Sequence, residues 1–270
     1  MNEENPLAPS LRLLWHGLPA PEKGPRPRLS LPQIVDAAVA LADEGGLDGL
    51  SMRTLARELG VGTMSLYRYV PSKTELLNLM LDSVSAPAAE DSEAVHRGWR
   101  SALEAAARST RRMFLRHPWV LQASWTRPVM GPNSMAAMDL RLSGLHGLPL
   151  SDREKMGVLS AVDAYVMGLV RQEVLWQGAA EESGMTDEEF WQHQVPFFTA
   201  AMASGRFPAL TQLADDTFDA GWEEDFAFGL TMFLDGVEQT IVRRRGGGDQ
   251  EQRACMSGPD EPMGRPGRIG

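Results

Sequence analysis

The sequence predicts an all-α protein. Apolar residues recur three and four positions apart along most of the 270 residues, which is the spacing of one face of a helix. Several of these segments open with a serine or threonine followed three positions later by Glu or Gln, the pattern of an N-terminal capping box, at Ser30, Ser72, Ser151 and Thr186. Alternation of apolar and polar residues, which is typical of strands, never extends beyond a few positions.

The first third of the chain is predicted to hold a flexible segment followed by four short helices. Residues 1–29 are rich in proline and glycine and end in a basic run containing Lys23, Arg26 and Arg28, so we expect a mobile basic arm. The first helix begins after Ser30 and is expected to stop at Gly45-Gly46. Three more helices are predicted over residues 51–60, 62–69 and 72–85.

The rest of the chain is also predicted to be helical. Pro87 and the acidic residues after it mark a boundary, and the glycine run 246–248 opens a polar tail that we expect to be disordered. Between them, helices are predicted over residues 99–117, 118–125, 133–145, 151–178, 186–203 and 222–245. The predicted organisation is therefore an arm at 1–29, a small domain at 30–77, a larger domain at 78–245 and a tail at 246–270.

Charge and composition limit what this protein can bind and where in the cell it can act. Residues 1–74 carry eight basic and eight acidic residues, so the net charge of −10 lies entirely in residues 75–270. A neutral module can still present a basic face to phosphates. The single cysteine, Cys255, cannot form an internal disulfide or a multi-cysteine zinc site. No stretch approaches the roughly 20 apolar residues of a membrane span, and no secretory signal begins the chain, so we expect a cytoplasmic protein that does not bind membranes.

Residues 54–70, TLARELGVGTMSLYRYV, form the most informative motif. Leu55, Leu59 and Leu66 would face a small core between two crossing helices, and Ala56 would lie where these helices come closest. Gly60 can adopt the left-handed conformation that ends the first helix sharply. Two helices joined by a short glycine-containing turn form a helix-turn-helix, which places its second helix in the major groove of DNA.

The exposed side of this motif predicts the DNA contacts. Hydroxyl, guanidinium and ammonium groups there suit phosphates and base edges, and Lys73 adds its charge to the backbone N–H groups of a helix start. The candidate DNA-binding residues are Arg28, Arg53, Thr63, Met64, Ser65, Tyr67, Arg68, Tyr69 and Lys73. The alternative interpretation is that these side chains form an ordinary solvated face.

The segment from Gly49 to Leu77 resembles the DNA-binding domain of TetR-family repressors, whose motif spans about residues 31–77 here. The resemblance implies a homodimer on a pseudo-palindromic operator in double-stranded DNA. It also implies that a ligand bound in the C-terminal domain moves the fourth helix as a lever and separates the two recognition helices.

A weaker resemblance covers the C-terminal domain. Thr126-Arg127-Pro128 and the helix ending at Gly147 are similar in order and spacing to the tetracycline repressor, where such a turn borders the drug pocket. The polar drug contacts of that protein are replaced here by Ala89, Ala106, Thr110, Ala123 and Asp139, and its histidine and asparagine ligands are absent. The resemblance therefore does not extend to binding of tetracycline with magnesium, and we expect neither a metal nor a cofactor.

The C-terminal helices are predicted to enclose a pocket for a bulky apolar or aromatic effector, because they are rich in tryptophan and flexible methionine. Asp139 and Asp163 interrupt apolar helical patterns, where a charge is costly unless it is paired or used. Either could line the pocket or pair with an arginine such as Arg127. The candidate ligand-binding residues are Trp99, Leu103, Ala106, Thr110, Met113, Trp125, Arg127, Met135, Asp139, Asp163 and Met167. For each of them, a purely structural role in the core is the alternative.

The last long helix predicts a second buried surface. Phe226, Leu230, Phe233, Val237 and Ile241 form one stripe, while Phe228 and Leu234 fall away from it. A stripe wider than one core face suggests contact with a second subunit. Together with the helix capped by Ser151, it would form an isologous four-helix interface.

These observations predict a ligand-responsive DNA-binding transcriptional regulator, a repressor released from its operator by a small, largely apolar or aromatic molecule. Two alternatives stay open: a transcriptional activator of the same family, and a helical ligand-binding protein without sequence-specific DNA function. An enzyme is not expected, because no HExxH, GxSxG, paired-carboxylate or phosphate-binding glycine motif is present.

Overall fold

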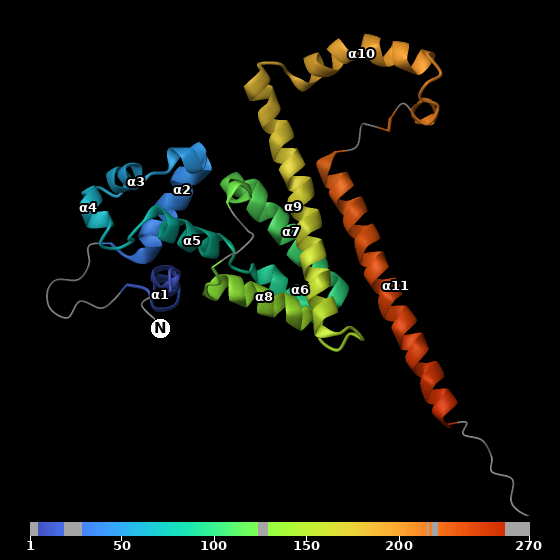
Figure 1. Cartoon of the computed structure of the whole chain (residues 1–270), viewed down its shortest axis with the longest axis horizontal. Coiled ribbons are helices and arrows are strands. Elements are labelled where there is room, and N and C mark those ends of the chain that lie inside the picture. The colour runs from blue at the N-terminus through green and yellow to red at the C-terminus, as the bar shows by residue number, and fades with distance from the viewer. Residues whose placement is uncertain (1–4, 19–28, 124–128, 215, 218–220, 257–270) are drawn as a thin grey trace, which may run out of the picture.

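The computed structural model describes residues 5–18, 29–123, 129–214, 216–217 and 221–256, and all regular structure in these ranges is helical. This confirms the predicted fold class. Figure 1 shows a head formed by the helices within residues 8–84 and a body formed by the helices within residues 89–256. The helices are α1 (Ala8–His16), α2 (Leu31–Gly49), α3 (Met52–Glu58), α4 (Thr63–Leu66), α5 (Lys73–Val84), α6 (Ala89–His96), α7 (Trp99–Arg116), α8 (Pro132–Gly144), α9 (Asp152–Ser183), α10 (Asp187–Ala203) and α11 (Trp222–Met256), with short 3₁₀ helices η1 (Pro118–Gln122) and η2 (Leu210–Gln212).

Helix α2 begins at the predicted capping box. The Gln33 amide donates to Ser30 Oγ at 3.4 Å, and the Ser30 amide donates to Gln33 Oε1 at 2.8 Å. Gly46 leaves the helical region, with φ 64° and ψ −175°, as the predicted stop requires. The chain then resumes a helical turn, so α2 is kinked at Gly46 and ends at Gly49.

Part of the predicted mobile arm is a helix that belongs to the core. In α1, Ala8, Ser10 and Leu13 are buried, and the helix packs against α5. Pro9 in the first turn and the apolar spacing within 8–16 favour this helix, but the proline- and glycine-rich surroundings conceal it in the sequence. Residues 19–28, which include Lys23, Arg26 and Arg28, lie outside the described residues.

Two other boundaries differ from the prediction. The acidic segment expected as a boundary forms α6, whose N-terminus is stabilised by a hydrogen bond from the Ala88 amide to Asp91 Oδ2 at 3.0 Å. Helix α11 passes the expected end at Arg245 and continues to Met256, because the Asp249–Ala254 stretch after the glycines is composed largely of residues that tolerate a helix well. The tail beyond Met256 lies outside the described residues.

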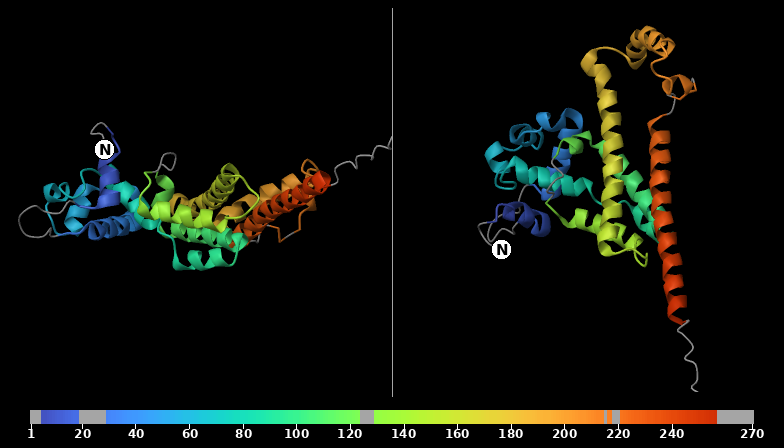
Figure 2. Two further views of the ribbon diagram at one scale, coloured as in Figure 1. Left: turned by 90° about the horizontal axis from the view of Figure 1, so that it is seen from below. Right: turned by 45° about the vertical axis from the view of Figure 1, so that its right-hand side comes forward.

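The body is organised around α7, which packs against α6, α8 and α9. Helices α9 and α11 run beside each other in opposite directions, and α10 extends away from them (Figures 1 and 2). On α11, the side chains of Phe226, Leu230, Leu234, Val237 and Ile241 are buried. Leu234 therefore belongs to the core stripe and was wrongly placed outside it, because the buried face follows spacings of four, four, three and four.

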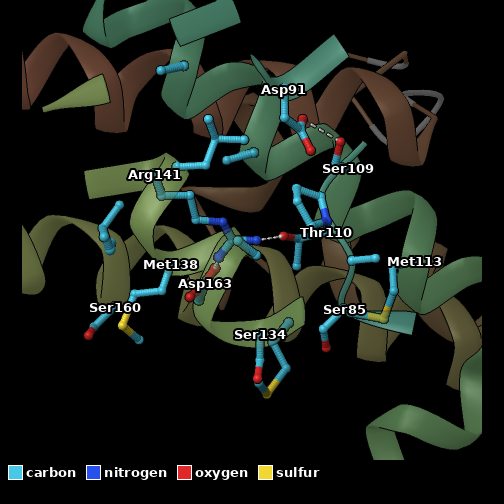
Figure 3. A pocket seen from close by; sticks show the side chains of 18 of the residues that line it. Ser85, Asp91, Ser109, Thr110, Met113, Ser134, Met138, Arg141, Ser160 and Asp163 are labelled. Carbon is cyan, nitrogen blue, oxygen red and sulfur yellow. Dashed lines mark hydrogen bonds and ion pairs between the residues drawn. The ribbon is translucent and has the colours of Figure 1, made fainter. Parts of the chain in front are cut away.

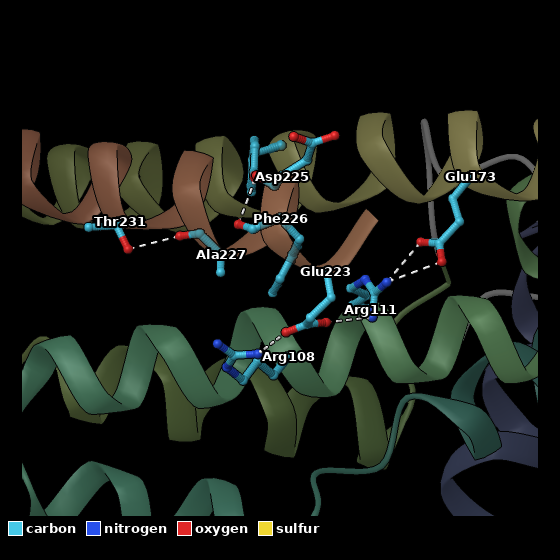
Figure 4. Close-up of polar contacts among 9 residues, drawn as sticks. Arg108, Arg111, Glu173, Glu223, Asp225, Phe226, Ala227 and Thr231 are labelled. Atoms are coloured by element: carbon cyan, nitrogen blue, oxygen red, sulfur yellow. Dashed lines mark hydrogen bonds and ion pairs between the residues drawn. The ribbon is translucent and has the colours of Figure 1, made fainter. Parts of the chain in front are cut away.

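A polar network joins the three long helices of the body (Figure 4). Arg111 of α7 donates to both carboxylate oxygens of Glu173 on α9, at 3.1 and 3.0 Å, and to Glu223 of α11 at 3.0 Å. The Arg111 and Glu173 side chains are only 14% and 7% exposed. The Arg111 guanidinium also lies 5.3 Å from the centre of the Phe226 ring. One largely buried cation therefore joins α7, α9 and α11.

The contact between Glu154 and Arg244 predicts acid-sensitive packing of α9 against α11. Hydrogen bonds from Arg244, and from the side chain and backbone of Ser151, lower the pKa of Glu154 from 4.5 to about 2. A depressed carboxyl pKa means that the stabilisation is present above pH 4.5 and is lost as the pH falls toward 2. We expect Glu154→Gln to lower the melting temperature slightly near neutral pH, because the pair is exposed, and the difference from wild type to vanish by about pH 2.

Melting temperatures measured by circular dichroism between these pH values test this expectation. Glu58→Gln is the control, since it removes an exposed carboxylate for which no ion pair is found within the described part of the chain. A wild-type advantage that stays constant with pH would remove Glu154 from the acid response.

Candidate functional site

The helix-turn-helix is formed by α3 and α4. Gly60 ends α3 with φ 63°, and the Gly60 and Val61 amides donate to the carbonyls of Arg57 and Ala56 at 3.1 and 3.0 Å. These two bonds form a Schellman motif, for which a left-handed glycine is suited. Leu55, Ala56 and Leu66 are at most 1% exposed, which confirms the predicted core between the two helices.

Five of the predicted DNA-contacting residues lie in α4 or directly after it, at the outer edge of the head (Figure 1), namely Thr63, Met64, Ser65, Tyr67 and Arg68. Met64 is 78% exposed and Tyr67 40% exposed. Arg68 is exposed, and its Nη2 donates to Ser65 Oγ at 3.2 Å, which holds the guanidinium along the surface of α4. The α4 segment thus presents hydroxyl, thioether and guanidinium groups to the outside.

The remaining candidates differ in their surroundings. Arg53 is exposed in the first turn of α3, and Thr63 is half-buried at the start of α4. Lys73 is exposed, and its Nζ donates to the Leu47 carbonyl at 2.8 Å, which ties the start of α5 to the end of α2. Tyr69 is half-buried and packs against the core of the head. Arg28 lies outside the described residues.

The head is attached to the body through a partly buried polar contact as well as through α5. Asp43 on α2 accepts a hydrogen bond from Trp119 Nε1 at 2.7 Å, and the same oxygen lies 2.8 Å from His117 Nδ1. Trp119 is only 1% exposed. Because η1 follows directly on α7, this contact connects α2 of the head to α7 of the body.

A cavity of about 550 Å³ lies in the body, between α6, α7, α8 and α9 and beside the end of α5. Its apolar lining consists mainly of alanine and methionine, and its polar lining is shown in Figure 3. The lining includes Ala106 and all of its polar and methionine residues, namely Ser85, Asp91, Ser109, Thr110, Met113, Met130, Ser134, Met138, Arg141, Met156, Ser160, Asp163 and Met167. A cavity of this size and character suits a small, largely apolar molecule.

Arg141 is the central polar group of the cavity. Its Nη1 donates to Asp163 Oδ1 at 3.0 Å and its Nη2 to Thr110 Oγ1 at 2.8 Å, so α8 is held against both α7 and α9 (Figure 3). Burial raises the pKa of Asp163, and the Arg141 charge opposes this shift. The Asp163 side chain nevertheless retains 44% of its accessible surface, which places it on the cavity wall rather than in packed core.

The structure places the predicted ligand-binding residues in three groups. Ala106, Thr110, Met113, Asp163 and Met167 line the cavity. Trp125 and Arg127, with the Thr126–Pro128 turn, lie outside the described residues. Four others do not line the cavity, namely Trp99, Leu103, Met135 and Asp139.

The surroundings of these four residues explain why they do not line the cavity. Leu103 is 1% exposed, and Trp99 packs against the core, so both serve the interior. Met135 and Asp139 are exposed because the face of α8 that lines the cavity carries Ser134, Ala137, Met138 and Arg141 instead. The spacing of these four residues was visible in the sequence, but which face of α8 would turn inward was not. Asp163 does pair with an arginine, as one of the two sequence interpretations required, and that arginine is Arg141.

The body also carries exposed apolar surface. On α11, Phe228, Met232 and Val242 are 70%, 61% and 56% exposed, and on α9 Leu175 is 63% exposed. Small residues of α9 are exposed as well, namely Gly157, Ala161 and Gly168. Helix α10 adds exposed aromatic residues, of which Phe197 is 77% exposed.

Two kinds of feature are absent from the same described ranges. Within them, no three side chains of the His, Cys, Asp and Glu types lie close enough to hold a metal ion. Nor does any helix there combine the length and apolar character needed to cross a membrane.

Two family descriptions match the chain. Residues 34–80 match the bacterial regulatory proteins of the tetR family, and residues 93–241 match the tetracyclin repressor-like C-terminal domain. The first match contains α3, α4 and most of α5, and the second contains the residues around the cavity from Val95 onward.

Curated relatives and solved structures agree with these matches. The chain is 46% identical over 240 residues to the HTH-type transcriptional repressor DrrR1 of Streptomyces coeruleorubidus, covering 89% of this chain and 88% of the relative. It is 30% identical to the class A tetracycline repressor from transposon 1721 of Escherichia coli, covering 78% and 92%. The fold matches ActR of Streptomyces coelicolor, solved in complex with actinorhodin, with a TM-score of 0.62 and 26% identity, covering 80% and 99%.

Proposed function

Because the chain belongs to the TetR family of bacterial transcriptional regulators, and is thus a ligand-responsive DNA-binding protein and not an enzyme, we propose that it is a cytoplasmic repressor. It binds a pseudo-palindromic operator as a homodimer, and a small apolar or aromatic molecule in the cavity releases it. One observation carries this proposal: α5 leads from the exposed α4 surface directly to the wall of the cavity, where Val84 and Ser85 are lining residues.

The cavity supports an effector with an apolar body and a polar edge. Five methionines give its wall an adaptable apolar surface, while Arg141 and Thr110 offer donors at one place. ActR, which is similar in fold, has been solved with actinorhodin and with (S)-DNPA. We propose that the effector of this protein places an oxygen-bearing edge at Arg141 and its apolar remainder among the methionines.

The exposed apolar faces of α9 and α11 support the homodimer. Clusters of exposed large apolar side chains often mark a protein–protein contact site. The exposed small residues of α9 would allow close approach of a second copy, while Phe228 and Met232 on α11 would fill the space between the helices. The aromatic face of α10 would be covered by the same partner.

Phe228→Glu is expected to convert the dimer into monomers. A carboxylate would be buried opposite its own copy, and an unpaired buried charge costs several kcal/mol. Sedimentation velocity at about micromolar concentration measures the outcome. Met64→Glu is the matched control, because it places the same charge on an equally exposed apolar position of α4 and is expected to leave the dimer intact. A dimer that survives Phe228→Glu would exclude this face of α11 from the interface.

Neutralising the basic arm is expected to flatten the salt dependence of operator binding. Lys23→Gln, Arg26→Gln and Arg28→Gln in one variant remove three charges while retaining α1. The slope of log K against log salt concentration is negative, and each phosphate contact that is lost reduces its magnitude by about 0.9. The control replaces Arg253, Arg265 and Arg268 by glutamine, which gives the same change in net charge at the other end of the chain. An unchanged slope would exclude the arm from phosphate contact.

A gel-shift titration against the upstream intergenic DNA of the gene, with unrelated DNA as competitor, tests the proposed function as a whole. Binding that resists the competitor supports a sequence-specific regulator, and aromatic compounds can then be screened for release of the complex. Binding no tighter than to the competitor would favour the alternative of a helical ligand-binding protein. A reporter gene behind the same DNA distinguishes repression from activation.

A further inference from the structure

Three sets of hydrogen bonds connect α1, α5 and the start of α8. Asp82, in the last turn of α5 and only 5% exposed, accepts from the Ser134 amide at 2.9 Å, from Ser134 Oγ at 2.8 Å and from the Asn133 amide at 3.3 Å. A Cβ at position 131 would overlap the Asp82 carboxylate, so Gly131 is required for this close approach. The end of α5 is therefore fastened to the start of α8.

Helix α1 makes the other two sets, each a single hydrogen bond. Asn78 on α5 donates through Nδ2 to Ser10 Oγ at 2.9 Å, and Ser10 is 2% exposed. At the other end of α1, Trp15 Nε1 donates to the Met130 carbonyl at 3.1 Å, immediately before Gly131. Leu13 is buried in the same core as the helices of the head. Helix α1 thus bridges α5 and the segment that leads into α8, as its place beside both in Figures 1 and 2 also indicates.

The bridged segment is also a wall of the cavity. Met130 and Ser134 both line it, as do Val84 and Ser85 at the end of α5. A molecule in the cavity can therefore contact the same residues that Trp15 and Asp82 hold in place. Because α5 leads to the helix-turn-helix, any shift of this segment is transmitted to the head through two connections rather than one.

We propose that α1 is part of the ligand switch, and that Trp15 and Asp82 are positioning residues that transmit the state of the cavity wall at 130–134 to α5. This inference rests on the proposed function for its direction, since it presumes that the head binds DNA. Asp82 provides the direct connection between α5 and α8. Trp15 provides the second connection through α1, and it makes the N-terminal helix a working part of the regulator rather than a passive extension.

Coupling between two sites is reciprocal, so binding of DNA at the head must alter the cavity wall if the inference holds. Hydrogen exchange with mass spectrometry can follow residues 129–136 in the full-length protein, alone and with its upstream DNA. In the wild type, we expect DNA to slow exchange in this segment, although it lies in the body. Trp15→Phe retains an aromatic ring but cannot donate to Met130, and it is expected to bind DNA while losing this DNA-dependent change.

The free protein provides a measurement that does not depend on DNA. Loss of one hydrogen bond should speed exchange in residues 129–136 by about fivefold in Trp15→Phe. Trp176→Phe is the matched control, because Trp176 Nε1 also donates one hydrogen bond, to Asp187 Oδ2 at 2.8 Å, at a distant place on α9. Asp82→Asn, which retains one acceptor oxygen, should speed exchange in the same segment.

The outcomes separate this inference from the proposed function. If no DNA fragment is bound by the wild type, the proposed function fails, while the free-protein exchange still decides whether Trp15 holds the cavity wall. If Trp15→Phe and Trp176→Phe behave alike in the free protein, or if Trp15→Phe retains the full DNA-dependent change, the linkage through α1 is refuted.

Discussion

Arg68→Ala is expected to weaken operator binding by roughly 10- to 100-fold, because a side chain that contacts a base edge or phosphate from the recognition helix contributes about 1–3 kcal/mol. Arg68 is exposed, and its one side-chain hydrogen bond in the described chain is to Ser65, so its truncation leaves the buried Leu66 and the rest of the core intact. Titration of labelled upstream DNA by fluorescence anisotropy measures the loss, and a melting curve checks that the fold is retained.

A change in net charge alone could weaken binding to DNA, and the control addresses this. Arg97→Ala removes the same charge from an exposed position directly after α6, in the body, and is expected to leave specific binding within about twofold, as the effect of distant charges is largely screened by salt. Tyr67→Ala, at an exposed position beside Arg68, should weaken binding in the same direction as Arg68→Ala. If both α4 variants bind as tightly as the wild type, the recognition surface lies elsewhere on the head.

Glu173→Ala is expected to lower the free energy of unfolding by about 3 kcal/mol, because removal of one partner from a buried ion pair leaves the other charge uncompensated. The remaining partner of Arg111, Glu223, is 57% exposed and compensates only in part. The loss would loosen α9 from α7, while the contact of Arg111 with Glu223 on α11 remains. Urea unfolding at a fixed protein concentration is the measurement, because the stability of a dimer depends on concentration.

The matched control lies on the same helices. Glu238→Ala removes a carboxylate of α11 that pairs with Arg100 of α7 at 3.1 Å, and both of these side chains are substantially exposed, at 53% and 32%. Exposed pairs contribute about 0–1 kcal/mol, so this variant should be nearly as stable as the wild type. Equal losses in the two variants would show that burial does not distinguish the two ion pairs.

Much of the head could be predicted from the sequence because its determinants are local. The cap at Ser30, the left-handed turn at Gly60 and the exposed Arg68 each depend on residues within a few positions of one another. The periodicity of α9 and α11 was likewise readable, although Leu234 shows that a stripe drawn on a helix can be off by one position. The cap at Thr186, where the Glu189 amide donates to Thr186 Oγ1 at 3.2 Å, was predicted for the same local reason.

The cavity could be predicted only in part, because its lining depends on how whole helices are turned. Ala106, Thr110 and Met113 on α7 were identified from one helix face, yet Ser134, Met138 and Arg141 on α8 were missed. The phase of α8 follows from contacts with residues far away in the chain, in particular Asp82 at its start and Thr110 and Asp163 along its length. None of these pairings has a short-range signal in the sequence.

The sequence by itself therefore determined the all-helical class, the helix-turn-helix and the family, since capping, turn formation and helix periodicity are properties of neighbouring residues. Only the tertiary structure decided that α1 belongs to the core, that Arg141 pairs with Asp163, and that α5 and α8 meet at Asp82. The physical reason is that a buried polar or charged group requires a partner, and which partner reaches it is settled only when distant helices pack together.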